Sequence, residues 1–343
     1  MRMRAVGLDF ANRRLGERMV PEPPWPGDGE VLLRVRYVGV CGTDRFLAFW
    51  EFGAPPPDSD FLILGHEALC EVVEAGRGVA NLAPGDLVVP IVRRPCQPPC
   101  ASCARGRRDL CLTGRYTERG IVGADGYFTE YALDRAEDLI FVPAELADVA
   151  ILVEPLSVVE KAVETALRLH DDAPRTALVF GAGTIGILAA LAFRERGLEV
   201  TVCSLEPEDH PRAGWLREAG FTYEQVPTRR TADIVLEAAG PAAAAFAAVR
   251  ALAPLGVCGI LGAASDAAGD FPFRSLLLGN QRVFGSVNAS PDAFRRAVED
   301  LARFDRRLLS RLIRRCRFED YVETILGPAQ PAPKPVHVVA EGR

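Results

Sequence analysis

Apolar residues in the first 150 positions occur in short runs that proline and glycine interrupt. The runs at 31–38, 68–75 and 87–92 predict β-strands, and the opening residues MRMRAVGLDF predict a further strand. A proline-rich stretch at 21–27 is expected to be a stiff surface connection. The first part of the chain is therefore predicted to be rich in β-structure.

The pattern changes near Glu154, where helix-forming residues follow over 157–170. Beyond this point, apolar runs typical of buried strands alternate with helical segments. The predicted strands are 176–180, 199–204, 232–237 and 257–261. This alternation predicts an α/β fold with a parallel, doubly wound sheet. The closing part returns to a helix at 292–304 and a last strand at 335–340.

These two patterns predict two domains. Residues 157–286 would form the dinucleotide-binding domain, and residues 1–156 together with 287–343 would form the other. A chain of 343 residues has room for two cores of this size.

Composition narrows the class of protein. Hydrophobic residues make up 49% of the chain, charged residues make up 25%, and the formal net charge of -6 offers no electrostatic footprint for nucleic acid. Arginines gather at 105–108 and 311–317, where we expect solvated faces. No apolar run approaches 18 residues, and no export signal is recognised, so we expect a cytoplasmic protein without a membrane span. In that setting the nine cysteines are better explained by metal binding than by disulfides.

The string GAGTIG directly follows the apolar strand 176–180 and begins a helix, which is the context that makes a G-x-G-x-x-G string specific. Gly181 would allow the tight turn, Gly183 the approach of a pyrophosphate, and Gly186 close packing of helix on strand. Thr184 and Ile185 lie between these glycines, at the helix N-terminus that supplies amide donors. The alternative is a simple strand–helix turn.

The end of the next strand bears on the choice of cofactor. Ser204 and Glu206 lie there, and no arginine precedes Arg212. A carboxylate at this place suits the ribose hydroxyls of NAD and repels the 2′-phosphate of NADP, so NAD is favoured. Glu206 could instead be a solvated loop residue.

Cys41 and His66 are candidate ligands of a catalytic zinc, with Glu67 and Glu154 as carboxylate donors. Taken singly, a cysteine is often a small core residue, a histidine a satisfied core residue, and Glu154 a carboxylate placed at a helix start. Thr43 is a candidate relay for the substrate's proton. Asp44 could orient His66 by accepting its second ring proton, although Thr43 and Asp44 could also be turn residues.

A second metal site is predicted from four cysteines within sixteen residues: Cys96, Cys100, Cys103 and Cys111. Four thiolates form a closed, structural zinc site. The alternative, a zinc ribbon that binds nucleic acid, is disfavoured by the acidic balance of the chain.

Over its full length the chain resembles the zinc-dependent medium-chain dehydrogenase/reductase family, through CGTD, GHE, the four cysteines, EP and GAGTIG in this order. A closer likeness, to the glucose 1-dehydrogenase branch, rests on longer strings. These are CGTDR, GHEALCEV, VRRPC, TGRYTERGI, DGYFTEY, LVEPLSVVEKA and GSVNAS. The resemblance implies a β-rich GroES-like catalytic domain beside a Rossmann-type domain, two zinc ions per chain, and dimers or tetramers.

The resemblance also implies roles for single residues. Cys41, His66 and Glu67 would lie in the catalytic zinc sphere, Glu154 near zinc and sugar, and Thr43 on the path of the proton. Two further residues, Glu118 and Asn288, match positions that contact the sugar or its neighbourhood.

Several positions depart from that branch. Cys70 replaces a glycine, the spacing from Cys96 to Cys100 is one residue longer, Val92 would change one sugar contact, and SLEP at 204–207 lacks the arginines that hold NADP. The expected reaction is oxidation of an aldose at C1 to a lactone. Oxidation of a polyol, an amino-sugar or a threonine-type alcohol is the alternative, and a non-catalytic nucleotide-binding protein is a third reading.

Overall fold

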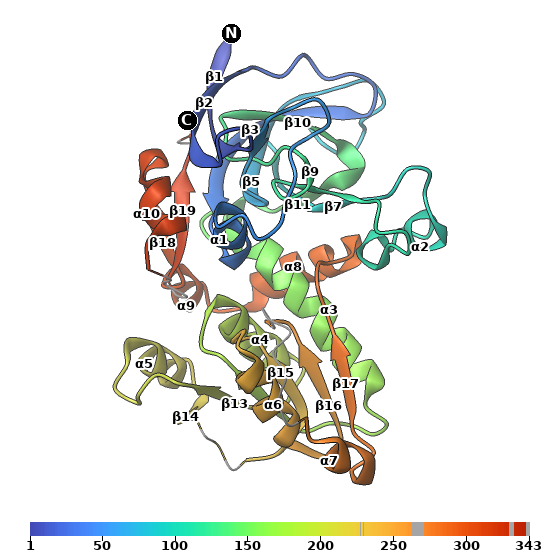
Figure 1. Ribbon diagram of the computed structural model, residues 1–343, viewed down its shortest axis with the longest axis vertical. Coiled ribbons are helices and arrows are strands. Elements are labelled where there is room, and N and C mark those ends of the chain that lie inside the picture. The colour runs from blue at the N-terminus through green and yellow to red at the C-terminus, as the bar shows by residue number, and fades with distance from the viewer. Residues whose placement is uncertain (227, 229, 263–270, 329–332, 341–343) are drawn as a thin grey trace. The chain divides into compact units, whose positions relative to one another are not determined.

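The computed structural model describes residues 1–226, 228, 230–262, 271–328 and 333–340. The chain forms two compact units (Figure 1). Unit 1 comprises residues 1–154, 288–302 and 309–343, and unit 2 comprises residues 155–287 and 303–308. The assignment of metal binding to one unit and cofactor binding to the other stays a prediction.

The described strands of unit 1 form three sheets. In the first, β1 (Arg2–Asp9) lies between β2 (Arg14–Pro21) and β4 (Phe61–Ile63), and all three strands pair antiparallel. The largest sheet has seven strands. Its main order is β11 (Leu139–Val142), β6 (Leu87–Pro90), β5 (Glu67–Ala75), β3 (Glu30–Gly39), β19 (Lys334–Val338) and β18 (Ile313–Cys316). The seventh strand, β10 (Tyr131–Arg135), pairs with β3 beside β19. The third sheet contains β7 (Arg93–Arg94), β8 (Thr117–Arg119) and β9 (Gly123–Ala124).

The predicted strands of unit 1 correspond to β1, β3, β5, β6 and β19, with ends that differ by a few residues. Short helices join the strands: α1 (Gly42–Ala48), α2 (Ala101–Ala104), α10 (Tyr321–Leu326) and several 3₁₀ turns. Helices α3 (Val153–Leu169), α8 (Pro291–Arg303) and α9 (Arg306–Ser310) each contain a boundary between the units.

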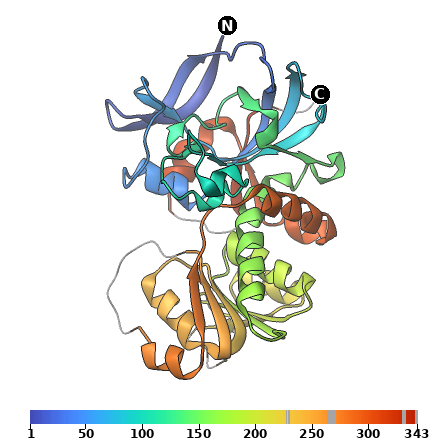
Figure 2. The ribbon, with the colours of Figure 1, turned by 90° about the vertical axis from the view of Figure 1, so that its right-hand side faces the viewer.

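Unit 2 is built on a six-stranded parallel sheet whose faces are both covered by helices (Figure 2). The order along the sheet is β14 (Thr222–Gln225), β13 (Glu199–Ser204), β12 (Thr176–Phe180), β15 (Ala232–Glu237), β16 (Leu252–Ile260) and β17 (Arg282–Gly285). The covering helices include α4 (Thr184–Glu195), α5 (Pro211–Glu218), α6 (Ala242–Arg250) and α7 (Phe273–Leu278). The order reverses between β12 and β15, which is the arrangement of a Rossmann fold. The predicted α/β fold with a doubly wound parallel sheet is confirmed.

The core of unit 2 explains two cysteines that the metal sites do not use. Cys203 and Cys258 are fully buried and pack with Leu178, Val235 and Val249. Burial raises the pKa of both thiols to about 12, so they remain neutral side chains of the apolar core.

The arginine clusters are mostly exposed or half-buried, with Arg108 as the buried exception. Arg108 is buried and pairs with Asp138, while the guanidinium of Arg315 lies 3.8 Å from the ring centre of Tyr37. The interpretation as solvated faces is therefore wrong for Arg108, whereas Arg315 is exposed, as that interpretation expects. No helix within the described ranges has both the length and the apolar character needed to cross a membrane.

Candidate functional site

The end of β3 and the start of α1 position Cys41. Cys41 is the N-cap of α1: its sulfur accepts the backbone N–H of Thr43 at 3.2 Å, and its own N–H donates to the Asp44 carboxylate at 2.9 Å. Strand β5 pairs antiparallel with β3 and places Glu67 opposite Gly39. The register brings the His66 ring to Cys41, with 3.0 Å between His66 Nε2 and Cys41 Sγ.

The second ring nitrogen of His66 faces the carboxylate of Asp44. Asp44 Oδ1 lies 3.4 Å from His66 Nδ1, and both side chains are almost completely buried. Burial lowers the pKa of His66, but the charges of Cys41 and Asp44 outweigh it and hold this pKa well above its usual value. A carboxylate behind a histidine ring orients the ring toward a metal ion, as the sequence predicted for Asp44.

Two further carboxylates, those of Glu67 and Glu154, lie near His66. Donor atoms of His66, Glu67 and Glu154 all lie within 4.8 Å of one another, as do those of Cys41, Asp44 and His66. Glu154 is in the first turn of α3, so it is both a helix-start carboxylate and a member of the cluster. Burial and the neighbouring Glu67 raise the pKa of Glu154 to about 7.

Lys334 completes this cluster, and no motif in the sequence indicated it. Its Nζ lies 2.8 Å from Glu67 Oε1 and 2.6 Å from Oε2, and donates to the Val40 carbonyl at 3.1 Å. Of the 40 lysine and arginine residues only two are lysines, Lys161 and Lys334, and both are buried. A Cβ atom at Gly39 would collide with Glu67 and approach Lys334 Cε to 3.0 Å. Only glycine leaves room there for the ion pair.

The cluster fits a divalent zinc ion in both its atoms and its charge. Sulfur, imidazole nitrogen and carboxylate oxygen are the donors that zinc takes in proteins. Burial lowers the pKa of Lys334, but Glu67 and Cys41 outweigh it and raise that pKa, just as the pKa values of His66 and Glu154 are raised. The shifts at His66 and Lys334 report excess negative charge at this place, and at Glu154 the charge of Glu67 adds to the effect of burial. A bound dication would neutralise this charge.

We expect the substitution Lys334→Met to destabilise the protein by about 3–5 kcal/mol, because it leaves the Glu67 carboxylate buried without its counter-ion. Urea or thermal unfolding of purified protein measures the loss. In the double variant Lys334→Met/Glu67→Gln the loss should be smaller than the sum of the single losses. Additive effects would show that the pair contributes nothing as a pair.

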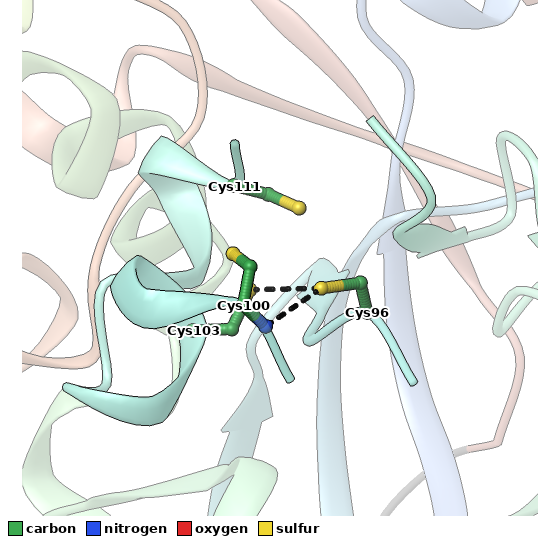
Figure 3. Close-up of side chains that lie close together, drawn as sticks. All are labelled: Cys96, Cys100, Cys103 and Cys111. Carbon is green, nitrogen blue, oxygen red and sulfur yellow. Dashed lines mark hydrogen bonds between the residues drawn. The ribbon is translucent and has the colours of Figure 1, made fainter. Parts of the chain in front are cut away.

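The four cysteines of the second predicted site also come together (Figure 3). Cys96 Sγ lies 3.7 Å from Cys103 Sγ, and all four sulfur atoms lie within 4.8 Å of one another. Backbone N–H groups point at the sulfurs: Cys100 N–H donates to Cys96 at 3.2 Å, and Leu112 N–H donates to Cys100 at 3.4 Å. Backbone donors lower the pKa of Cys100 to about 6, whereas burial raises that of Cys103 to about 12. Four sulfurs with amide donors suit a closed zinc site, so these residues fit the ion.

A buried ionic network anchors this cysteine lobe to the large sheet. Arg108, just before Cys111, pairs with Asp138. Arg94 bridges Asp138 at 3.1 Å and Asp134 on β10 at 2.7 Å. The lobe is therefore tied to the sheet by charges that lie away from water.

Glu118 and Asn288, 170 positions apart, are in direct contact. Asn288 Nδ2 donates to Glu118 Oε1 at 2.6 Å, and Arg93 Nε donates to the same oxygen at 2.9 Å. Asn288 has a φ of 61°, a left-handed conformation that asparagine tolerates better than most residues. Val92 is buried. The structure thus brings together the two predicted sugar residues, and it adds Arg93, which the sequence did not indicate.

In unit 2, GAGTIG forms the turn between β12 and α4. Gly181 has a φ of 110°, and a Cβ atom there would lie 2.9 Å from the Ala238 carbonyl oxygen. A Cβ atom at Gly186 would overlap the Gly181 carbonyl oxygen. Gly183 is the N-cap of α4, which starts at Thr184 and continues through Ile185. The turn has the backbone that dinucleotide binding requires, although binding itself stays a prediction.

Residues at the end of β13 and just after it pair with one another. The hydroxyl of Ser204 donates to the Glu206 carboxylate, and Arg212 forms an ion pair with the same group. Arg212 comes from the first turn of α5, six positions after Glu206. The Glu206 carboxylate, which favours NAD, therefore has the Arg212 guanidinium beside it. The sequence did not indicate this pairing.

Two families match adjoining parts of the chain. Residues 27–144 match the alcohol dehydrogenase GroES-like domain, and residues 147–325 match the glucose dehydrogenase C-terminus.

Individual relatives match over most of their length. The glucose 1-dehydrogenase of Methanocella arvoryzae is 39% identical over 325 residues, which is 89% of this chain and 90% of that protein. The glucose 1-dehydrogenase of Thermoproteus tenax is 41% identical over 328 residues, 90% of this chain and 92% of that protein. Among solved structures, the Haloferax mediterranei glucose dehydrogenase in complex with NADP, Zn and gluconolactone superposes with a TM-score of 0.89, at 30% identity, over 99% of this chain and all of that one.

Proposed function

Because the chain belongs to the glucose dehydrogenase branch of the zinc-dependent medium-chain dehydrogenase/reductase family, we propose that it oxidises the C1 hydroxyl of an aldose. The hydride passes to NAD or NADP and the sugar leaves as a lactone. The observation that carries this proposal is the convergence of Cys41, His66, Glu67 and Glu154 in one buried cluster with excess negative charge. A non-catalytic nucleotide-binding protein would not need such a cluster.

In this proposal, Cys41 and His66 hold the catalytic zinc, with Glu67 and Glu154 as its carboxylate neighbours. A zinc ion held there supplies Lewis acidity, which lowers the pKa of a bound hydroxyl. Asp44 fixes the ring of His66, and Lys334 balances the charge of Glu67.

Thr43 is proposed to carry the substrate's proton. Its backbone N–H is fixed on the Cys41 sulfur at 3.2 Å, which keeps Thr43 at the start of α1 beside the metal ligand. A hydroxyl can accept one proton while it donates its own, so Thr43 can pass the proton outward without acquiring a lasting charge.

Glu118 is proposed to bind the hydroxyls of the sugar, with Asn288 and Arg93 as the groups that orient its carboxylate. Both partners donate to Oε1, and among the described residues no side chain donates to Oε2. A sugar hydroxyl that donates to Oε2 would form a charge-assisted hydrogen bond. Val92 is buried immediately before β7, so any contact between the sugar and this position would be apolar.

For the cofactor, we propose that NAD is favoured and that NADP is also used. Glu206 keeps a carboxylate near the place of the 2′-phosphate, which favours NAD. Arg212 supplies a cation at the same place, and NADP requires one. The Haloferax mediterranei relative was solved with NADP.

A panel of aldoses and polyols, each with NAD and with NADP, tests the function. We expect an aldose such as glucose to reduce the cofactor, followed by the slow release of acid as the lactone hydrolyses, and a higher kcat/KM with NAD than with NADP. Absorbance at the reduced-nicotinamide band records turnover, and metal analysis should find about two zinc ions per chain. Preference for a polyol or an amino alcohol would move the assignment to the alternative substrates. A well-folded protein without activity on any of them would favour the non-catalytic reading.

The substitution Glu118→Gln is expected to raise the KM for the aldose about 10-fold or more, because a charge-assisted hydrogen bond to the sugar becomes a neutral one. The KM for the cofactor should stay the same. Steady-state kinetics with each substrate varied in turn provide the measurement. Glu130→Gln, on a half-buried residue of the same unit, is the matched control. An unchanged sugar KM in Glu118→Gln would exclude this residue from substrate binding.

Assembly into dimers or tetramers and a cytoplasmic location complete the proposal. Apolar side chains of α7 are open to solvent, with Phe273 71%, Leu277 76% and Leu278 70% exposed, and β17 is an edge strand of the parallel sheet. Exposed apolar patches and free strand edges are typical of surfaces that associate. Light scattering after size-exclusion chromatography measures the assembly state.

A further inference from the structure

The side chain of Glu237 joins two turns at the carboxyl edge of the parallel sheet. Glu237 is the last residue of β15 and is fully buried. Its Oε1 accepts the backbone N–H groups of Ala239 and Gly240, both at 2.7 Å. Its Oε2 accepts the backbone N–H of Gly262 at 3.1 Å. One carboxylate therefore holds the turn after β15 and the turn after β16.

This residue lies at the point where the strand order reverses. Glu237 is the register partner of Phe180, the last residue of β12, and Ala238 N–H donates to the Phe180 carbonyl at 2.8 Å. Gly181 follows and packs against the carbonyl of Ala238. In open parallel sheets, ligands bind outside the carboxyl ends of the strands at this reversal point. Glu237 is thus connected to the turn on which the dinucleotide is proposed to bind.

The two turns are in close contact. Gly240 has a φ of 104°, and a Cβ atom at Gly262 would lie 2.7 Å from the Gly240 nitrogen. A contact this close leaves no space for a side chain, so a side chain at either glycine would push the two turns apart. Two hydrogen bonds on one oxygen and one on the other set how closely these backbones approach.

We propose that Glu237 is a positioning residue for the nicotinamide cofactor: it fixes the backbone at the switch point so that the dinucleotide meets a preformed surface. The inference rests on the proposed function, since it requires unit 2 to bind NAD or NADP. Glu237 acts through Ala239, Gly240 and Gly262, because its own carboxylate is buried and occupied by backbone donors. No role in proton or hydride transfer is assigned to it.

The substitution Glu237→Gln tests this inference. Glutamine has nearly the same shape, but its NH₂ group would face at least one N–H that needs an acceptor, so one turn would be released. We expect the Kd for NADH, from fluorescence titration, to rise about 10-fold or more, since a hydrogen bond to a charged group is lost. Zinc content and the sugar KM at saturating cofactor should not change. Glu199→Gln, on an exposed residue at the amino end of β13, is the control that should bind NADH like the wild type.

Each outcome separates the inference from the proposed function. Wild-type protein that binds neither NADH nor NADPH would overturn the proposed cofactor and the role of Glu237 with it. Wild-type binding with an unchanged Kd in Glu237→Gln would overturn the inference alone, even if the melting temperature falls. Should Glu237→Gln fail to fold, Gly262→Ala separates the same turns while keeping the carboxylate. That variant should also raise the Kd, and an unchanged Kd in it would overturn the inference.

Discussion

Replacement of Cys41 by serine is expected to lower kcat at least about 100-fold while the Kd for NADH changes little. The Cys41 sulfur lies 3.0 Å from the His66 ring in a cluster that fits zinc, and serine does not provide a thiolate. Loss of residues that merely support a metal ligand typically costs 10- to 100-fold in affinity or activity, so loss of a ligand should cost more. Steady-state kinetics and elemental analysis of the same preparation measure both effects.

The control for this variant is Cys316→Ala, which removes a buried thiol of unit 1 that lies on β18 and belongs to neither candidate metal site. It should keep its activity and its zinc. Cys41→Ser protein with normal turnover would remove the metal cluster from the mechanism. Protein that lost zinc from the four-cysteine lobe as well would show that the variant had unfolded.

A second large effect is expected from Cys103→Ser in the four-cysteine lobe. Zinc content should fall by about one ion per chain, and the thermal midpoint should fall by about 10 °C or more. Structural zinc contributes directly to folding, by about 10 kcal/mol or more in isolated small domains. Here the lobe is also held by the network of Arg108, Asp138 and Arg94, so only part of that energy should be lost. A loss of about 4 kcal/mol corresponds to a shift of about 8–16 °C in a unit of this size.

Calorimetry of wild type, Cys103→Ser and Cys316→Ala measures the shift. The two variants should differ clearly, because both remove a buried thiol but only Cys103 has three sulfur neighbours. Below its melting temperature Cys103→Ser should keep substantial kcat, since the cluster around Cys41 is intact. A Cys103→Ser protein with the zinc content and midpoint of the wild type would show that the lobe binds no structural metal.

The strands of the parallel sheet could be predicted well from the sequence, and the short elements could not. β12, β13 and β15 have the predicted bounds, because strands buried on both faces form continuous apolar runs. Helix α1 was missed because its seven residues, GTDRFLA, are too few to show a helical period. Strands β14 and β17, of four residues each, lack a pattern of their own and depend on their neighbours in the sheet.

The residues of the candidate site likewise fall into a group that the sequence predicts and a group that it does not. Cys41, His66 and the four cysteines carry their chemistry in local strings, which made them recognisable. Lys334 and Arg93 became visible only through pairing between separate strands, and Arg212 only through the loop that brings it back to Glu206. Lys334, for example, reaches Glu67 because β19 and β5 both flank β3. For Lys334 the sequence did hold one indication. Arginine supplies nearly all the positive charge of this chain, so a lysine indicates a position where a compact cation is needed.

The same scarcity of lysine has a chemical consequence for a protein proposed to handle reducing sugars. Open-chain aldoses condense with free amines and slowly glycate the proteins around them. Lys161 and Lys334, the two lysines of the sequence, both lie inside the fold, so neither side-chain amine is open to solvent. Guanidinium groups are far weaker nucleophiles because they stay protonated. The lysine side chains of this protein are therefore expected to be poor targets for glycation by an aldose.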